Sequence, residues 1–423
     1  MGAIQAIRGT RDILPKESGH WQYIEQIAQQ ILGRACYQEI RTPIFEQTAL
    51  FERGIGEATD VVGKEMYSFM DRGDRPLTLR PEGTAGVVRA YIEHNLQSLG
   101  SVQRLWYKGP MFRYERPQAG RQRQFHQIGV EVLGTEDPRS DAEVVALAMD
   151  IFANLGLTQL TLALNSVGNG EDRQRYRQAL VDYLTPYQEE LDADSRERLQ
   201  RNPLRILDSK SAQTQTIIEQ APSILDYLCP ASCHHFQQVQ QLLSDLHIPF
   251  VITPSLVRGL DYYTHTAFEI QSSDLGAQAT VCGGGRYDGL VSSLGGPPTG
   301  AVGWAMGLER LVILLQHLQP PSELKPHFYI IARGAEAERK SLLLAQKLRG
   351  EDFRVELDLS GSAFAKQFKR ADRSGAIACL IMGEAEATAG NVQLKWLASQ
   401  TQEELTWANL FERLPELKNQ LVC

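Results

Sequence analysis

The residues best suited to chemistry in this 423-residue chain are arginines set beside aromatic and acidic side chains. Arg113 lies in Phe-Arg-Tyr-Glu, and Arg121 lies in the polar loop that follows. Arg258 precedes Gly-Leu-Asp-Tyr-Tyr, and Arg310 ends Gly-Leu-Glu-Arg. The planar guanidinium binds a phosphate or carboxylate through two hydrogen bonds at once. Because a single arginine is most often a solvated or ion-paired surface residue, the hypothesis of a phosphate site depends on the four together.

Other nucleotide and metal motifs are absent from the sequence. No Gly-x-x-x-x-Gly-Lys-Ser/Thr loop occurs, and Gly283–Gly285 fails the dinucleotide-binding pattern because Asp288 stands where the third glycine is needed. The segment Cys229–His235 carries two cysteines and two histidines. Their spacing is atypical of structural zinc, and no second ligand pair follows at a finger-like distance. We therefore predict a helix boundary there and no protein metal site.

The bulk composition indicates a folded enzyme of two or three domains. The formal net charge is −8, which argues against the electrostatic wrapping of nucleic acid, so any RNA contact must come from local basic patches. Six scattered cysteines without a secretory signal are typical of reduced thiols, and this predicts a cytoplasmic protein. No apolar stretch is long enough to cross a bilayer, so we predict no membrane role.

The first third of the chain changes from helical to β-rich patterning. Apolar spacing from Trp21 to Ile31 predicts an amphipathic helix that stops at Gly33. Strand-like runs follow at 37–42, 77–80, 104–107, 111–114 and 127–133. The last two flank a polar loop rich in Arg and Gln, which predicts a long antiparallel hairpin.

Residues 170 to about 247 are charged and Gln-rich with helical apolar spacing, which predicts an inserted helical domain. β-like sequence resumes at Phe250–Thr253 and continues through Tyr262 to Ile270. It closes with a strand and a helix within Gly303–Leu315.

Gln319–Ser322 and Pro326 mark a linker. Beyond it, strand-like runs at 327–332, 354–359 and 377–382 alternate with helical stretches. That alternation is typical of a small α/β domain with a parallel sheet.

Three stretches look like the class motifs of one enzyme group: Gln38–Pro43, Gly109–Gln127 and Gly303–Arg310. Three more agree with a single family in that group: Arg258–Tyr263, Gly284–Gly289 and Leu79–Thr84. On these residues the chain resembles the class II aminoacyl-tRNA synthetases, and in particular the histidyl-tRNA synthetase family. The resemblance covers nearly the whole sequence.

The resemblance implies an α+β catalytic domain at 1–325, in which helices flank a class II-type antiparallel sheet and the helical insertion occupies about 170–247. It implies a C-terminal α/β anticodon-binding domain with a mixed sheet at 326–423. The implied reaction is the ATP-dependent activation of L-histidine to histidyl-adenylate, then transfer of the histidyl group to the 3′ end of tRNA(His) with release of AMP and pyrophosphate. The substrate carboxylate is ionised at neutral pH and needs no general base. The main source of rate acceleration is then the stabilisation of moving negative charge by fixed cations.

The resemblance also assigns residues to roles. The implied catalytic residues are Arg113, Arg258, Gln127 and Glu82. The implied histidine pocket has Glu82, Thr84 and Gln127 at the ammonium group and Glu131, Tyr262, Tyr263 and Tyr287 at the imidazole. Arg113 would bridge the substrate carboxylate and the α-phosphate, and Arg258 would approach the α-phosphate from the other side. ATP would be bound, together with Mg²⁺, by Arg113, Glu115, Arg121, Phe125 and Arg310. The alternative for these tyrosines is strand packing, which the neighbouring Arg258 and Asp261 disfavour.

Two local basic regions are predicted to contact tRNA in spite of the acidic total. One is the loop after Arg113, through Arg116, Gln118 and Arg123. The other is a helical face formed by Lys366, Lys369 and Arg370, for which a merely solvated face is the alternative interpretation. The resemblance further implies a homodimer formed through the Pro43 region.

His265, Trp304 and Ser362–Ala365 depart from the family pattern without touching the residues assigned above. The main alternative function is the non-catalytic, synthetase-like regulatory subunit of ATP phosphoribosyltransferase. That protein would be expected to lack the C-terminal module and the ATP-binding arginines. A second alternative is an RNA-binding scaffold with an inactive catalytic fold. This chain has both the module and the arginines, which disfavours both alternatives.

Overall fold

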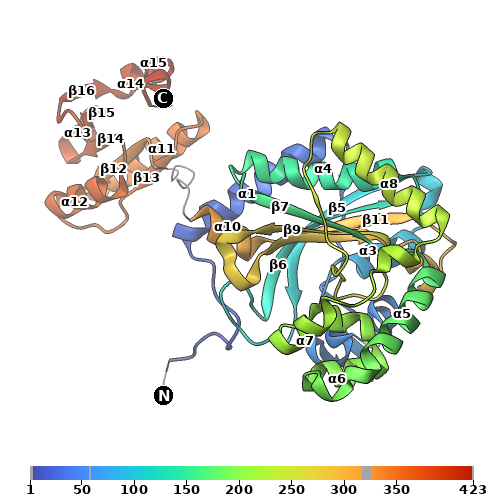
Figure 1. Ribbon diagram of the computed structural model, residues 1–423. Coiled ribbons are helices and arrows are strands. Elements are labelled where there is room, and N and C mark those ends of the chain that lie inside the picture. The colour runs from blue at the N-terminus through green and yellow to red at the C-terminus, as the bar shows by residue number, and fades with distance from the viewer. Residues whose placement is uncertain (1–2, 57–58, 317–324, 422–423) are drawn as a thin grey trace. The chain divides into compact units, whose positions relative to one another are not determined.

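The computed structural model describes residues 3–56, 59–316 and 325–421 (Figure 1). It divides into two units, Met1–Pro321 and Ser322–Cys423, each with its own large sheet. The predicted linker Gln319–Ser322 lies outside the described residues. None of the helices in those three ranges is long and apolar enough to cross a membrane.

The first unit contains an eight-stranded sheet in the order β1-β5-β6-β11-β10-β9-β7-β8. The inner strands pair antiparallel, and only the short edge strands β1 and β8 run parallel to their neighbours. The predicted fold class, an antiparallel sheet flanked by helices, is therefore confirmed. The strands are β1 (Gln38–Glu39), β5 (Gln103–Phe112), β6 (Gln124–Leu133), β7 (Leu160–Ser166), β8 (Val251–Ile252), β9 (Thr264–Ser272), β10 (Thr280–Arg286) and β11 (Ala301–Gly307).

Alternation along β6 separates the two faces of this sheet. Ile128, Val130 and Val132 are buried in the apolar core on the helix-covered face. Gln127 and Glu131 therefore project from the opposite face. The helices that complete the core are α1 (Pro15–Arg34), α4 (Pro138–Asn154), α8 (Pro230–Asp245) and α10 (Leu308–Leu315) (Figure 1).

The hairpin of β5 and β6 is confirmed, with pairing from Gln103 opposite Leu133 to Phe112 opposite Gln124. The two predicted runs at 104–107 and 111–114 belong to one strand. Pairing with β1 is limited to Leu105 and Trp106, so Pro110 removes no hydrogen bond on that side. The predicted strand at 37–42 is reduced to the two residues of β1.

A separate three-stranded sheet lies beside the main one. Its strands are β2 (Phe45–Gln47), β4 (Pro76–Leu79) and β3 (Tyr67–Met70), and helices α2 (Thr48–Ile55) and α3 (Thr84–Glu93) pack nearby. The buried Arg80 joins this sheet to the hairpin, because its Nε donates to the Pro110 carbonyl at 2.9 Å and its Nη1 to the Thr42 carbonyl at 3.1 Å.

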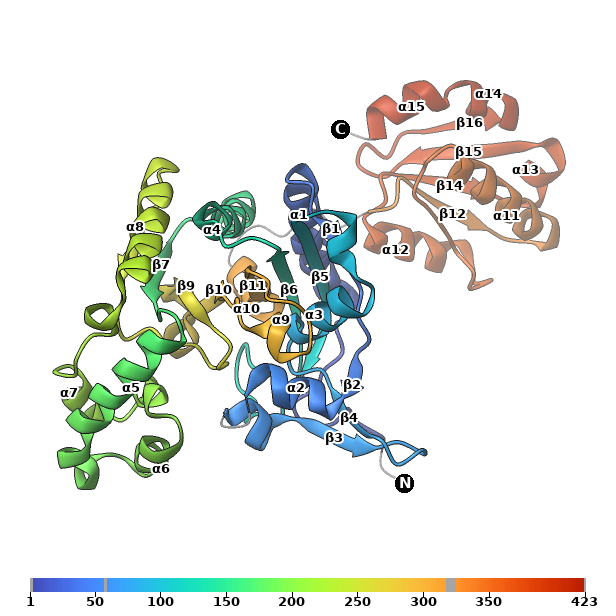
Figure 2. The same ribbon diagram turned by 90° about the vertical axis from the view of Figure 1, so that its right-hand side faces the viewer.

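Residues 170–247 consist of helices separated by short 3-10 turns. Tyr176 and Leu180 belong to the apolar core of this lobe, which Figure 2 shows away from α1 and α4. The last helix, α8, instead contributes Phe236 and Val239 to the core of the main sheet. The helices of the lobe are α5 (Gly170–Leu184), α6 (Ala193–Arg201) and α7 (Ala212–Ile218).

The predicted strand through Tyr262 is wrong, because residues 253–263 form an irregular loop and β9 begins at Thr264. Asn165 stabilises this loop, since its Nδ2 donates to the Pro254 carbonyl at 3.1 Å and to the Leu256 carbonyl at 3.0 Å. These side-chain bonds replace the sheet pairing of a strand.

The second unit has a five-stranded sheet in the order β13-β12-β14-β15-β16. The first three strands are parallel, and a C-terminal hairpin adds two antiparallel strands. The sheet is therefore mixed, as the resemblance implies, and not wholly parallel. The elements are β12 (Phe328–Ala332), α11 (Ala335–Gly350), β13 (Val355–Leu357), α12 (Phe364–Ser374), β14 (Ala378–Met382), α13 (Glu384–Ala389), β15 (Asn391–Trp396), β16 (Gln402–Thr406), α14 (Trp407–Glu412) and α15 (Leu414–Leu421).

Candidate active site

A cavity of about 200 Å³ opens on the face of the main sheet from which Gln127 projects. Its lining includes all four arginines singled out in the sequence, which come from the hairpin loop, the 253–263 loop and α10: Arg113, Arg121, Arg258 and Arg310. Glu115, Phe125 and Gln127 line the same cavity. Residues nearly 200 positions apart are thus brought to one site.

The arginines at the hairpin end lie close enough to one another for their charges to interact. Arg121 is ion-paired with Glu115, and Nε of Arg113 donates to the Pro81 carbonyl at 2.9 Å. Burial lowers the pKa of Arg310, and the charges of Arg121 and Arg113 lower it further. Mutual repulsion of cations at a partly buried site is relieved when a polyanion binds.

Arg258 reaches the cavity from the opposite side. Burial alone would lower the pKa of its guanidinium, but the charges of Glu269 and Tyr263 raise it above the ordinary value. Arg258 forms an ion pair with Glu269 on β9. A Cβ at Gly283 would fall 2.2 Å from Nη2 of Arg258, so only glycine leaves room for the guanidinium across β10.

Buried carboxylates adjoin these arginines. Glu82 is buried where the chain enters α3, and its two oxygens accept from the backbone N–H groups of Thr84 at 2.6 Å and Ala85 at 2.8 Å. Burial raises the pKa of Glu82, although these backbone bonds oppose the shift. The carboxylate therefore satisfies N–H groups at the start of a helix while remaining at the site.

Glu131 is the second buried carboxylate. Its Oε1 accepts from the Thr84 hydroxyl at 2.8 Å, and its Oε2 accepts from the Tyr287 hydroxyl. Burial raises the pKa of Glu131 to about 8. A Cβ at Gly303 would fall 1.9 Å from Oε2, so the glycine makes space for this side chain.

Three tyrosines form an aromatic cluster beside Glu131. The ring centroids of Tyr262 and Tyr263 are 4.7 Å apart, and those of Tyr262 and Tyr287 are 5.6 Å apart. The guanidinium carbon of Arg258 lies 5.8 Å from the centre of the Tyr263 ring. The tyrosines thus adjoin both the arginines and the carboxylates, although Tyr263 and Tyr287 also belong to apolar cores.

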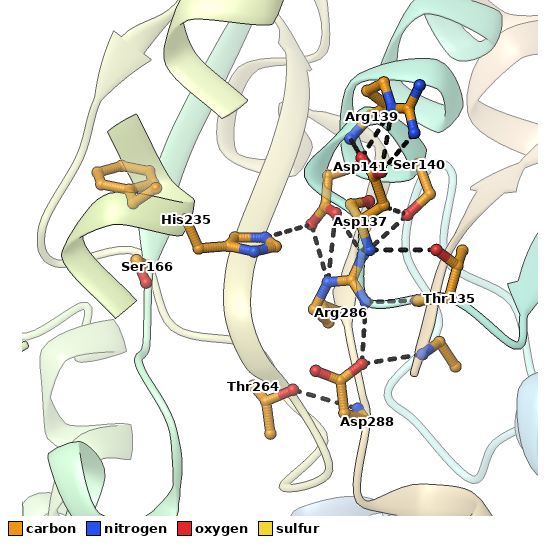
Figure 3. A network of polar contacts seen from close by, with 12 residues as sticks. Thr135, Asp137, Arg139, Ser140, Asp141, Ser166, His235, Thr264, Arg286 and Asp288 are labelled. Atoms are coloured by element: carbon orange, nitrogen blue, oxygen red, sulfur yellow. Dashed lines mark hydrogen bonds and ion pairs between the residues drawn. The ribbon is translucent and has the colours of Figure 1, made fainter. Parts of the chain in front are cut away.

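A fully buried ion pair stabilises the segment that carries Tyr287 (Figure 3). Nη2 of Arg286 contacts Asp141 Oδ2 at 2.5 Å and Ser140 Oγ at 2.8 Å, which ties the end of β10 to α4. Nη1 donates to Asp288 at 3.0 Å. This arrangement fixes both residues that flank Tyr287, and the sequence gives no indication of it.

The residues predicted to contact tRNA differ in their surroundings. Arg116 and Gln118 are exposed in the hairpin loop, whereas the Arg123 guanidinium lies 3.8 Å from the centre of the Tyr114 ring. In the second unit, Lys366 and Lys369 are exposed on α12. All five residues remain predictions as RNA contacts.

Arg370 lies on the same helical face, but its guanidinium is bound to other residues of the protein. Its Nε donates to Asp358 Oδ2 at 2.8 Å, and its Nη2 donates to Asp358 Oδ1 at 3.1 Å and to the Ser362 hydroxyl at 2.6 Å. A helical pattern shows which residues share a face, but it cannot show which of them a neighbouring loop has already paired.

The antiparallel sheet and the arginine-lined cavity define a class II aminoacyl-tRNA synthetase. A family model for histidyl-tRNA synthetase matches residues 9–311, and a model for an anticodon binding domain matches residues 327–417. The chain belongs to the histidyl-tRNA synthetase family.

Individual relatives support this family assignment. A histidine–tRNA ligase from Synechocystis sp. is 71% identical over 421 residues, covering 100% of this chain and 94% of the relative. The apo structure of Staphylococcus aureus histidyl-tRNA synthetase has 40% identity and a TM-score of 0.81, covering 97% of this chain and 99% of the other. A Bacillus halodurans chain described as an ATP phosphoribosyltransferase regulatory subunit/histidyl-tRNA synthetase has 22% identity and a TM-score of 0.66, so it shares the fold alone.

Proposed function

We propose that this protein activates L-histidine with ATP to histidyl-adenylate and then transfers the histidyl group to the 3′ end of tRNA(His), as a histidine–tRNA ligase. The observation that carries the proposal is the convergence of four arginines on one cavity next to the buried carboxylates of Glu82 and Glu131. The alternative of a non-catalytic regulatory subunit is disfavoured, because the arginine set is complete and the high-identity relatives are ligases.

Adenylate formation joins two anions, and the arginines are suited to that task. Arg113 would bind both the histidine carboxylate and the α-phosphate, while Arg258 approaches from the opposite side of the cavity. Both cations would stabilise the charge that moves toward the leaving pyrophosphate. The carboxylate attacks without a general base, so Gln127 and Glu82 would orient the substrate.

The remaining residues of the hairpin loop and α10 suit the rest of the ATP molecule. Phe125 would stack on adenine and Glu115 would accept from its amino group, while Arg121 and Arg310 would hold the β- and γ-phosphates. This requires Arg121 to leave its ion pair with Glu115.

Mg²⁺ would accompany ATP. Across the described ranges no group of three or more His, Cys, Asp or Glu residues could hold a metal ion unaided. Mg²⁺ bound with substrate phosphates needs only one or two carboxylates, and Glu115 and Glu309 line the cavity. We infer that Glu309 would hold the ion, whose charge would offset that of the phosphates, because Glu115 is assigned to adenine.

The carboxylate pocket would accept histidine itself. Glu82, Thr84 and Gln127 would bind the ammonium group, and Glu131 with Tyr263 would pair with the imidazole nitrogens, supported by Tyr262 and Tyr287. A pocket that hydrogen-bonds its substrate rejects analogues that lack the matching group, because buried polar atoms are then left unpaired.

The contacts proposed for tRNA lie in both units. Arg116, Gln118 and Arg123 would meet the acceptor end, and Lys366 with Lys369 would meet the anticodon. We retain Arg370 only as a nearby positive charge, because its guanidinium is bound to Asp358. The reaction on tRNA would take place in the cytoplasm.

A homodimer is proposed from the surface of the three-stranded sheet. Ile44, Phe45, Phe69 and Met70 are exposed large apolar side chains there, next to Pro43. Such a patch is typical of a protein–protein interface. Sedimentation should give the mass of two chains, and a stable, active monomer would overturn this assignment.

The overall reaction is tested by charging. Purified protein incubated with ATP, Mg²⁺ and labelled histidine should transfer label to tRNA(His) and not to a tRNA of another specificity. If the protein is folded and tRNA(His) acquires no label, the proposed function is contradicted.

A further inference from the structure

Tyr107, in the middle of β5, has a hydroxyl group without a hydrogen-bond partner among the described residues. The residue is only 3% exposed, so water does not readily take the place of a partner. A buried polar atom left unpaired is costly, and in a native structure it calls for a physical reason.

Two glycines make room for this side chain. Gly129 lies directly opposite Tyr107 on β6, and a Cβ there would fall 2.1 Å from Cζ of the tyrosine. A Cβ at Gly83 would fall 2.2 Å from Cε2. The ring therefore lies over β6 and against the turn between Glu82 and Thr84, in the middle of the carboxylate pocket.

The polar groups around the Tyr107 hydroxyl are mostly acceptors. Oε1 of Gln127, two residues along β6 from Gly129, is also buried without a partner within the described part of the chain. Burial raises the pKa of Tyr107 well above its ordinary value, and the carboxylates of Glu131 and Glu82 raise it further, while the Thr84 hydroxyl opposes the shift. Buried oxygen atoms gathered in this way are satisfied by a compact cation with several N–H donors.

We propose that the Tyr107 hydroxyl oxygen and Gln127 Oε1 each accept a hydrogen bond from the α-ammonium group of the bound amino acid. This inference rests on the proposed function and adds a substrate-binding residue to it. An ammonium group has three N–H donors, and the third would be shared between the Glu82 carboxylate and the Thr84 hydroxyl oxygen, which the proposed function places at this group. The imidazole needs only two partners, which Glu131 and Tyr263 supply.

The first test is the Tyr107→Phe variant, which removes the hydroxyl and keeps the ring between its glycines. Histidine affinity, measured by calorimetric titration, should fall about tenfold to a hundredfold, the range for a hydrogen bond to a charged group. Thermal stability of the free protein should stay the same or rise, because the lost hydroxyl has no hydrogen-bond partner among the residues that the structure describes. A lower melting temperature with unchanged histidine affinity would show a structural role and overturn the proposal.

The matched control is Tyr37→Phe. The Tyr37 hydroxyl is also buried, but it bonds to Glu143 Oε1 at 3.3 Å away from the cavity. This variant should leave histidine affinity unchanged.

The second test uses 3-(imidazol-4-yl)propanoate, which keeps the imidazole and carboxylate and lacks the ammonium group. Tyr107→Phe and the parent should bind this probe equally, while they differ for histidine. An equal loss for both ligands would place the hydroxyl at another substrate group and overturn the ammonium assignment. A folded parent that binds no histidine would instead contradict the proposed function itself.

Discussion

The Thr84 hydroxyl donates a 2.8 Å hydrogen bond to Oε1 of Glu131, and both side chains are buried. The bond joins the first residue of α3 to the C-terminal part of β6, so it connects the helix whose first backbone N–H groups donate to Glu82 with the strand that carries Gln127. Removal of the Thr84 hydroxyl would leave Glu131 with Tyr287 as its remaining side-chain donor. The geometry of the histidine pocket and the charge state of Glu131 are therefore coupled.

The stability of the ligand-free protein should depend on the ionisation of Glu131. Its pKa is raised from 4.5 to about 8, so the folded state holds a proton that the unfolded state has lost between these values. Stability therefore falls as the pH rises through this window. Glu131→Gln, which stays neutral, should gain stability relative to the parent from pH 4.5 to pH 8, by several kcal/mol at most. Urea unfolding at each pH measures the difference, and a pH-independent difference would contradict the prediction.

The buried ion pair beside Tyr287 should be important for stability. Arg286→Met leaves Asp141 charged, fully buried and unpaired except for a long contact to His235, and should cost about 3–5 kcal/mol. Arg139→Met is the matched control, because Arg139 pairs with Asp137 in the same network at the surface, where solvent screens the ion pair, and its loss should be much smaller. Equal losses in thermal unfolding of the two variants would show that burial of the pair is unimportant.

Gly283 should be required for the position of Arg258. Gly283→Ala places a methyl group 2.2 Å from the present position of Nη2, so the guanidinium must move. Misplacement of a catalytic group by about 1 Å can cost about a hundredfold in rate. Gly289→Ala, which meets nothing within 4 Å, is the control. Pyrophosphate-exchange rates should fall sharply only in the first variant, and similar rates in both would refute the assigned clash.

The basic residues of α12 should serve two functions, tRNA binding by Lys366 and Lys369 and stabilisation of the fold by Arg370. Lys366→Ala combined with Lys369→Ala should raise the KM for tRNA(His) several-fold and leave histidine-dependent pyrophosphate exchange unchanged. Arg370→Ala should lower the melting temperature of the second unit, because Asp358, with a side chain 1% exposed, loses its ion-pair partner. If Arg370→Ala raises the KM for tRNA without any change in melting, Arg370 is an RNA contact after all.

The sequence predicts the regular parts of this site well, because local periodicity and short-range order determine them. The hairpin of β5 and β6 and the passage from β11 into α10 follow from alternation and helical spacing. The loop that carries Arg258 does not, because Asn165, almost 90 residues earlier in the chain, stabilises it. The sequence cannot indicate that contact.

The same limit applies to partners of single side chains. The alternation of β5 shows that Tyr107 and Gly109 share a face, but not that the Tyr107 hydroxyl is unpaired. Likewise, helical spacing places Arg370 beside Lys366 without showing that Asp358 binds it. Pairing of this kind depends on tertiary packing.

The central claim is that this arginine-lined cavity activates histidine, and histidine-dependent exchange of pyrophosphate into ATP tests it most directly. The parent should show exchange with histidine and not with other amino acids. Arg258→Ala should lose about a hundredfold to a thousandfold, while Arg339→Ala, at an exposed ion pair on α11, should keep the parent rate. Absence of exchange in folded parent protein, or an unchanged rate in Arg258→Ala, would contradict the account.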